Sequence, residues 1–354
     1  MSESVRTIRP TEYARPRDPA IELSSMLIGH SAPMRRLRER VLRLSPSHLP
    51  VLLQGPSGSG KELVARALHL FSGRKGEFVG FNVAAIPDGM FEATLFGHTK
   101  GAFTGAIADG DGYLLEANGG TVFFDEIGAL PTPMQAKLLR ALDHQGFRAV
   151  GARRDTRSEF RPISATNEDI DNAVRMGTFR ADLAFRLRGG TIHVPPLRER
   201  LDDIPDLVHH FLNKASAHRV SSPSSCSDDA VRSLAQYDWP GNVRELHHVI
   251  QLAAALSEGR EIGPHEVRAA LADARGSGAP LPSRDPHFDA HRQRLLEILI
   301  RSDWNTSHAA RECGISRSHL YREMHHLGIR PARKSQRSTN NGGASGPTNE
   351  SSPA

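Results

Sequence analysis

Apolar residues follow two alternating spacings from about residue 27 onward. Segments with helical spacing lie at 27–44 and 61–71, and short continuous apolar runs separate them. Such runs are typical of strands buried on both faces of a parallel sheet, so the alternation predicts an α/β domain. Because proline is poorly tolerated in a central strand, we expect the strand within the last of these runs to begin at Pro162. The runs lie at 49–54, 77–83, 120–126 and 160–167.

The pattern also divides the chain into domains. Strand-like runs stop near residue 200, and helical spacing continues until a segment rich in Gly, Pro and Ser, which is typical of a linker. The predicted order is a disordered leader at 1–24, an α/β subdomain at 25–198, an all-helical subdomain at 199–272, a linker at 273–286, a small helical domain at 287–331 and a disordered tail at 332–354.

Composition narrows the class of protein. The 354 residues are enough for two or three domains, and Cys226 and Cys313 are too few for a disulfide framework or a zinc site. No apolar segment has the length of a signal peptide or membrane span, so we expect a cytoplasmic protein without membrane insertion. The net charge is +5, and residues 286–334 hold nine Lys and Arg against five Asp and Glu. This excess predicts that the C-terminal part binds nucleic acid.

A glycine-rich loop directly follows the first apolar run and precedes a helical segment. Backbone N–H groups of such a loop surround phosphates, and Lys61 is placed to reach the terminal ones. Glu62 stands where Ser or Thr would bind Mg²⁺. A purely structural turn is the alternative. The residues predicted to bind ATP here are Gly55, Pro56, Ser57, Gly58, Ser59, Gly60, Lys61 and Glu62.

Acidic residues end the third apolar run, where ligands of open α/β sheets bind. We predict that Asp125 holds Mg²⁺, directly or through water, and that Glu126 orients the attacking water. Asn167 ends the next run and is placed to touch the γ-phosphate or that water. An ordinary acidic loop after a strand is the alternative.

Six motifs in a fixed order give the chain a specific resemblance. From about Leu27 to Leu271 it resembles the AAA+ domain of bacterial sigma-54-dependent transcription activators, which act on sigma-54 RNA polymerase holoenzyme. The resemblance implies a ring, usually a hexamer, with ATP at each subunit boundary. The motifs are GPSGSGKE at 55–62, LFGHTKGAFTGA at 95–106, GGTVFFDE at 119–126, FRADLAFRL at 179–187, PPLRER at 195–200 and WPGNVREL at 239–246.

The resemblance assigns roles to further residues. Asn82 matches the asparagine that restrains the catalytic glutamate, and Arg244 matches a sensor arginine on the helical lid. Arg180 and Arg186 match a pair of arginine fingers that act on the neighbouring subunit's nucleotide, a role that a guanidinium fork suits. The alternative is that these residues only form ion pairs: Arg180 or Arg186 with Asp182 or Glu159, and Arg244 with carboxylates on its own helix. Glu62 is the residue that the family usually has after its lysine.

Within residues 98–106, positions 101–106 hold two glycines that bracket one aromatic residue and one hydroxyl, which predicts a mobile loop with a binding partner. The resemblance identifies this partner as sigma-54. The chain departs from the family at Thr94 and Thr99, which flank the loop, and at Pro56, Val83 and Ala129. The predicted contact residues are Gly101, Ala102, Phe103, Thr104, Gly105 and Ala106.

Residues 305–329 predict a helix, a tight turn at Gly314 and a second helix. They resemble the Fis-type helix-turn-helix of the same activators, and this resemblance implies binding to double-stranded upstream DNA as a dimer. The apolar spacing at 289–300 is suited to the helix that would form the dimer contact. Ser316 is expected to cap the second helix. The residues expected to contact DNA are Ser316, Arg317, His319, Tyr321 and Arg322.

Two functions remain open at this point. One is an ATP-hydrolysing sigma-54 activator, and the other is a DNA-binding regulator whose ATPase fold only serves assembly; an AAA+ protease or chelatase subunit would leave the 101–106 hexapeptide unexplained. About 25 residues precede the ATPase region, fewer than a receiver or sensory domain needs. We therefore expect control by a trans-acting regulatory protein or by the amount of activator, and a homo-oligomer or a hetero-oligomer with a co-activator.

Overall fold

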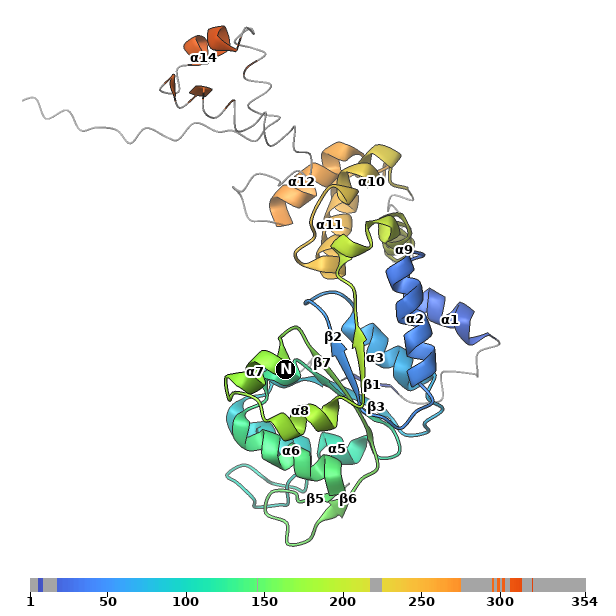
Figure 1. Ribbon diagram of the computed structural model, residues 1–354, viewed down its shortest axis with the longest axis vertical. Coiled ribbons are helices and arrows are strands. Elements are labelled where there is room, and N and C mark those ends of the chain that lie inside the picture. The colour runs from blue at the N-terminus through green and yellow to red at the C-terminus, as the bar shows by residue number, and fades with distance from the viewer. Residues whose placement is uncertain are drawn as a thin grey trace, which may run out of the picture. The chain divides into compact units, whose positions relative to one another are not determined.

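A computed structural model shows an α/β subdomain followed by a helical subdomain (Figure 1). The chain forms two compact units, 1–279 and 280–354. The structure describes residues 6–8, 18–144, 146–216, 225–274, 295, 298–299, 301–302, 306–313 and 320.

The α/β subdomain is built on one sheet with the order β1-β3-β4-β7-β2-β8. Neighbouring strands from β3 to β8 run parallel, and only β1 pairs antiparallel, with β3. The strands are β1 (Arg6–Ile8), β2 (Val51–Gln54), β3 (Phe78–Asn82), β4 (Thr121–Asp125), β7 (Arg161–Thr166) and β8 (Gly190–His193); β5 (Gly146–Phe147) and β6 (Thr156–Arg157) form a separate antiparallel pair.

Helices cover both faces of this sheet (Figure 1). Alternate side chains of β4 divide between two cores, because Val122 and Phe124 pack on one face and Phe123 on the other. One face carries α1 (Pro19–Met26), α2 (Ala32–Leu44) and α3 (Lys61–Leu70); the other carries α4 (Phe91–Phe96), α5 (Tyr113–Glu116), α6 (Thr132–His144), α7 (Ile170–Arg175) and α8 (Ala181–Leu187).

The helical subdomain, called the lid below, has its own core around Trp239, which is fully buried. The indole N–H of Trp239 donates a hydrogen bond of 2.9 Å to the Leu234 carbonyl, which fixes the turn before α11. The lid helices are α9 (Ile204–Ser216), α10 (Asp228–Ala235), α11 (Asn242–Leu256) and α12 (Pro264–Ala274). Short 3-10 helices are η2 (Val83–Ala85), η3 (Asp88–Met90), η4 (Ile127–Ala129), η5 (Leu197–Glu199) and η6 (Leu201–Asp203).

Several elements differ from the sequence prediction. Within the described part of the expected leader, β1 extends the sheet and α1 begins at Pro19, with the Asp18 carboxylate accepting a hydrogen bond from the Ala20 amide. Leu23 of α1 is fully buried, which explains why this segment is ordered. β8 was not among the predicted runs. Pro162 is the second residue of β7, one position before pairing with β2 begins at Ile163.

The second unit contains α14 (Thr306–Glu312) and a small apolar cluster. Ala309, Ala310 and Leu320 are buried in this cluster. Leu295 and Leu299, from the segment expected to form a dimer, are buried in the same cluster. The five predicted DNA-contacting residues lie outside the described residues.

Candidate nucleotide site

The glycine-rich loop connects β2 to α3 at the carboxyl edge of the sheet. Gly58 and Gly60 adopt positive φ angles of 73° and 104°, which residues with a Cβ rarely adopt. Lys61 is 8% exposed, and its ammonium group donates hydrogen bonds of 2.9 and 3.1 Å to the carbonyls of Gly55 and Pro56. Burial lowers the pKa of Lys61, while Asp125 and Glu126 oppose that shift. The lysine is thus held over the loop that it is predicted to serve.

The acidic strand end lies beside the loop. Parallel register places Asn82 of β3 opposite Asp125 of β4. Burial raises the pKa of Asp125, the charge of Glu126 raises it further, and Lys61 acts in the opposite direction. Glu126 has a left-handed backbone at φ 56°, a conformation that costs roughly 1–2 kcal/mol for a residue with a side chain. The Asn82 side-chain oxygen accepts a hydrogen bond from the Ala84 amide at 2.8 Å.

The lid packs directly on the glycine-rich loop. The Gly58 carbonyl accepts a hydrogen bond of 3.1 Å from the Val243 amide at the start of α11, and Asn242 donates to the Ser57 carbonyl at 2.9 Å. A Cβ on Gly58 would lie 2.3 Å from the Gly241 carbonyl oxygen. Arg244 reaches the Ser57 hydroxyl at 3.2 Å. Glycine at position 58 is therefore needed for loop conformation and for contact with the lid.

Residues from all these segments line one cleft of about 310 Å³. Four lining residues were not predicted from the sequence: Leu63, Phe211, Val243 and His247. His247 lies three positions after Arg244 on α11, a spacing that places both on one helix face and could have revealed it. The cleft is lined by Ser57, Gly58, Gly60, Lys61, Glu62, Leu63, Asn82, Asp125, Glu126, Phe211, Val243, Arg244 and His247.

Other predicted residues lie near this cleft without lining it. Gly55, Pro56 and Asn167 line a neighbouring cavity of about 640 Å³, between α2 and the ends of β2, β7 and β8. Ser59 is buried, and its carbonyl accepts a hydrogen bond of 2.9 Å from Arg200. The sequence correctly predicted that Asn167 follows a strand. It could not show that this strand end lines the neighbouring cavity and not the cleft that contains Lys61.

Glu62 faces the cleft and also pairs with Arg66, one turn further along α3, at 2.6 Å. Both hydrogen bonds from Arg66 go to the same carboxylate oxygen of Glu62, Oε1. Asp125, Glu126 and the side-chain oxygen of Asn82 line the same cleft and are hard oxygen donors, of the kind that Mg²⁺ prefers.

The predicted arginine fingers lie on α8 and at its N-terminus. Arg180 makes a two-pronged contact with Asp182, at 3.1 and 2.8 Å, which is the pairing weighed as the alternative. Arg186 pairs with Asp143 at 3.1 Å. Phe185, between them, is 85% exposed. Among the described residues, the lining of the cleft includes neither arginine.

The hexapeptide forms a compact turn at the surface. The Gly101 amide donates to the Ala106 carbonyl at 2.9 Å, and Gly101 and Gly105 have φ angles of 80° and 102°. Phe103 is 42% exposed, and its ring lies 5.1 Å from that of His98. Thr99 anchors the base of the turn, because its amide donates to the Val150 carbonyl at 3.0 Å. The aromatic residue is thus at the surface, as predicted.

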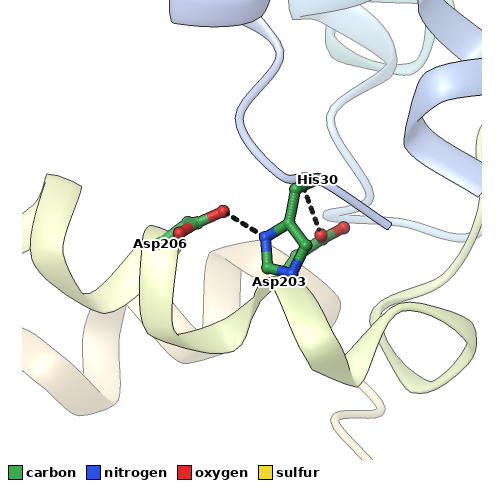
Figure 2. A group of neighbouring side chains, drawn as sticks. All are labelled: His30, Asp203 and Asp206. Atoms are coloured by element: carbon green, nitrogen blue, oxygen red, sulfur yellow. Dashed lines mark hydrogen bonds and ion pairs between the residues drawn. The ribbon is translucent and has the colours of Figure 1, made fainter. Parts of the chain in front are cut away.

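A clamp joins the start of α2 to the lid (Figure 2). One Asp203 oxygen accepts hydrogen bonds of 2.7 Å from the amides of His30 and Ser31, and the other accepts one from the Ser31 hydroxyl. His30 pairs with Asp206 at 2.8 Å, which raises the pKa of the imidazole. The spacing would also suit metal ligands. Because Asp203 already accepts three hydrogen bonds from the chain, we assign the group as a structural clamp.

The fold and the cleft together define an AAA+ P-loop domain with a helical lid. A family model for the Sigma-54 interaction domain matches residues 27–193, and one for the AAA+ ATPase lid domain matches residues 198–283. The crystal structure of NtrX from Brucella abortus in complex with ATP aligns at a TM-score of 0.65 with 32% identity, over 87% of this chain and 72% of that one.

Curated relatives agree with these matches. Response regulator protein PilR from Pseudomonas aeruginosa is 40% identical over 328 residues, which cover 89% of this chain and 73% of PilR. The DNA-binding transcriptional regulator NtrC from Azospirillum brasilense is 44% identical over 256 residues, covering 72% of this chain and 53% of NtrC. The chain belongs to the family of sigma-54-dependent transcriptional activators. Among the described residues, no helix is long and apolar enough to cross a membrane.

Proposed function

We propose that this chain binds upstream double-stranded DNA, assembles into a ring and hydrolyses ATP to remodel sigma-54 RNA polymerase holoenzyme for open-complex formation. One observation carries the proposal. A single cleft joins Lys61, the Asp125–Glu126 pair and Arg244, which come from three distant segments of the sequence. Each of these groups has a task in phosphoryl transfer. In the 101–106 turn on the same domain, Gly101 and residues 103–105 are exposed, whereas Ala106 is buried.

Nucleotide binding would use the loop as it is built. Backbone N–H groups of residues 58–61 and the N-terminus of α3 would face the phosphates. Lys61 would exchange two neutral carbonyl acceptors for charged phosphate oxygens, which are stronger acceptors for an ammonium group. Arg244 would approach the phosphates from the lid, starting from its contact with Ser57.

Hydrolysis would depend on the acidic end of β4. Asp125 would hold Mg²⁺, directly or through water, with Asn82 next to it in the sheet. Bound Mg²⁺ would neutralise charge that develops on the β- and γ-phosphate oxygens. Glu126 would orient and polarise the attacking water, and Asn82 would restrain Glu126 until nucleotide is bound. A role for Asn167 at the γ-phosphate stays a prediction.

The arginine fingers would act on a neighbouring copy. In its own chain Arg180 is paired with Asp182 and Arg186 with Asp143, and both face solvent. Bringing α8 of one subunit against the cleft of the next would offer both guanidinium groups to the γ-phosphate. This arrangement requires a ring, usually a hexamer, formed by identical chains or with a co-activator chain.

The 101–106 turn would transmit the effect of ATP hydrolysis to sigma-54. Phe103 and Thr104 would contact sigma-54. Gly101 and Gly105, both at positive φ, would give the backbone the freedom to move the turn toward or away from the rest of the domain. DNA binding by the C-terminal helix-turn-helix as a dimer would hold the ring upstream of the promoter. A trans-acting regulatory protein remains a prediction for control.

Replacement of Thr104 by alanine tests this proposal. We expect Thr104→Ala to hydrolyse ATP at close to the wild-type rate and to form no open complexes on a sigma-54 promoter, because it removes a contact and leaves the cleft unchanged. Thr104→Ser, which keeps the hydroxyl, should recover part of the activity. Normal open-complex formation by Thr104→Ala would show that this turn is not the output of the ATPase.

A further inference from the structure

One buried glutamine joins three segments of the α/β subdomain. Gln135 of α6 is fully buried. Its side-chain nitrogen donates hydrogen bonds of 2.9 Å to the carbonyls of Leu130 and Thr178, and its side-chain oxygen accepts one of 2.8 Å from the Arg180 amide. Both donors of the glutamine amide and its oxygen are thereby engaged. All three partners are backbone groups, so this side chain fixes the course of the main chain.

The first partner, Leu130, lies close to the acidic end of β4. The turn after Glu126 is closed by a hydrogen bond of 2.9 Å from the Ala129 amide to the Glu126 carbonyl. Leu130 follows this turn and is buried, and α6 begins two residues later, at Thr132. The hydrogen bond from Gln135 to Leu130 therefore attaches α6 to the segment that carries Glu126.

The other two partners lie where the chain enters α8. Arg180 is the N-cap of this helix, and its own side chain does not cap it. Amides at a helix N-terminus have no partner within the helix, and Gln135 supplies one to Arg180. Phe179, just before it, is buried in the core on this face of the sheet. Arg186 is also attached to α6, because its guanidinium group donates to the Leu142 carbonyl at 2.9 Å.

We propose that Gln135 is a positioning residue for ATP hydrolysis, which holds Arg180 where it reaches the γ-phosphate bound by the neighbouring subunit. The inference rests on the proposed function, since it assumes that Arg180 acts on the nucleotide of the next subunit. It adds that the segment following Glu126 sets the place of this arginine, because one side-chain amide binds both. A guanidinium group displaced by about 1 Å would lose much of its effect on the charge that develops in phosphoryl transfer.

Gln135→Met tests the inference, because methionine has a similar volume and cannot form the three hydrogen bonds. We expect kcat for ATP to fall about 100-fold, with affinity for a non-hydrolysable ATP analogue close to the wild-type value by calorimetry. Gln135→Glu keeps the length of the side chain and an oxygen that can accept from the Arg180 amide, so it should retain more of kcat. Thermal unfolding would show that each variant is folded.

Mixed rings show which nucleotide site the glutamine serves. The cleft of Gln135→Met and the α8 of Lys61→Ala would together form complete sites, so these two proteins should regain ATPase activity when combined. Gln135→Met and Arg180→Ala are impaired on the same side of the site, so their mixture should stay at the level of the separate proteins. Recovery with Arg180→Ala would mean that Gln135 serves the cleft of its own chain, and it would overturn the inference.

Three further outcomes decide the remaining possibilities. Recovery with neither protein would make Gln135 a purely structural residue, and wild-type kcat in Gln135→Met would deny it any role; both overturn the inference. Gln251→Met, the same exchange at an exposed position of α11 outside the cleft, is the matched control and should hydrolyse ATP normally. Failure of Lys61→Ala and Arg180→Ala to restore activity to each other would instead refute the proposed arginine fingers, and this inference with them.

Discussion

The glycine-rich loop and the exposed face of α8 hold their charged side chains in opposite ways. Lys61 is nearly buried, is fixed by two carbonyls and lies under a lid that packs on the same loop. Arg180 and Arg186 face solvent and pair with carboxylates of their own chain, with exposed Phe185 between them. The difference teaches that one chain by itself assembles the proposed phosphate-binding part of the cleft, whereas neither α8 arginine lines the cleft of its own chain.

Removing the α8 arginines should have the largest effect. If they act on a neighbouring subunit, Arg180→Ala and Arg186→Ala should each lower the ATPase rate about 10³-fold or more while ATP still binds with nearly wild-type affinity. Arg188→Ala is the control, because Arg188 follows the same helix and pairs with Asp171. Steady-state ATPase rates and calorimetry would measure the two quantities.

Mixing variants decides between action within a chain and action between chains. Arg180→Ala retains an intact Lys61, and Lys61→Ala retains intact arginines, so a mixed ring would contain some complete sites. ATPase activity should reappear when the two inactive proteins are combined. An inactive mixture that forms rings of normal size would place the arginines in a structural role within their own chain.

Loss of the lysine should have the next largest effect. Lys61→Ala removes a charged donor to phosphate, so we expect ATP affinity to fall about 100-fold and hydrolysis to become undetectable. The exposed Lys75, replaced in the same way, should change neither. Retention of full ATPase activity by Lys61→Ala would contradict the assignment of the loop.

Alanine substitutions at two glycines of the loop distinguish the effect of backbone strain from the effect of contact with the lid. Gly58→Ala and Gly60→Ala both place a Cβ on a residue with positive φ, but only the Cβ at position 58 meets the lid, whereas that at 60 has no atom within 4 Å. We expect Gly58→Ala to lower the free energy of unfolding by roughly 1–3 kcal/mol more than Gly60→Ala. Thermal and urea unfolding without nucleotide would measure it; equal losses would show that the lid contact adds no stability.

The smallest effect concerns two aspartates. Burial raises the pKa of Asp125, so folding disfavours its charged form, and this cost is present at neutral pH and disappears as the pH falls through the raised pKa. Asp125→Asn should therefore raise the melting temperature slightly at pH 7, with a smaller gain near pH 4. Arg180 lowers the pKa of exposed Asp182, so Asp182→Asn should give a slight loss at pH 7. Melting curves from pH 4 to 8 without nucleotide would test both signs.

Local patterns predicted much of this molecule, and contacts between distant segments account for what they did not predict. The four apolar runs are strands, and the glycine-rich loop and acidic strand end share a cleft. β8 was not predicted because its four residues include a glycine and a histidine and only one apolar side chain, Ile192. α1 was missed although Asp18 and Pro19 are recognisable helix-start residues. Phe211 could not be assigned, because only the packing of α9 against α11 brings it to the cleft beside His247, whose spacing from Arg244 was the one available signal.

Open-complex formation with purified components tests the central proposal most directly. The protein would be combined with promoter DNA and holoenzyme containing either sigma-54 or the primary sigma factor, with ATP or a non-hydrolysable analogue, and heparin-resistant complexes would be counted. The proposal predicts a large increase only with sigma-54 holoenzyme and hydrolysable ATP. Activation of the primary holoenzyme, or of sigma-54 holoenzyme without hydrolysis, would contradict it and favour a regulator whose ATPase fold serves only assembly.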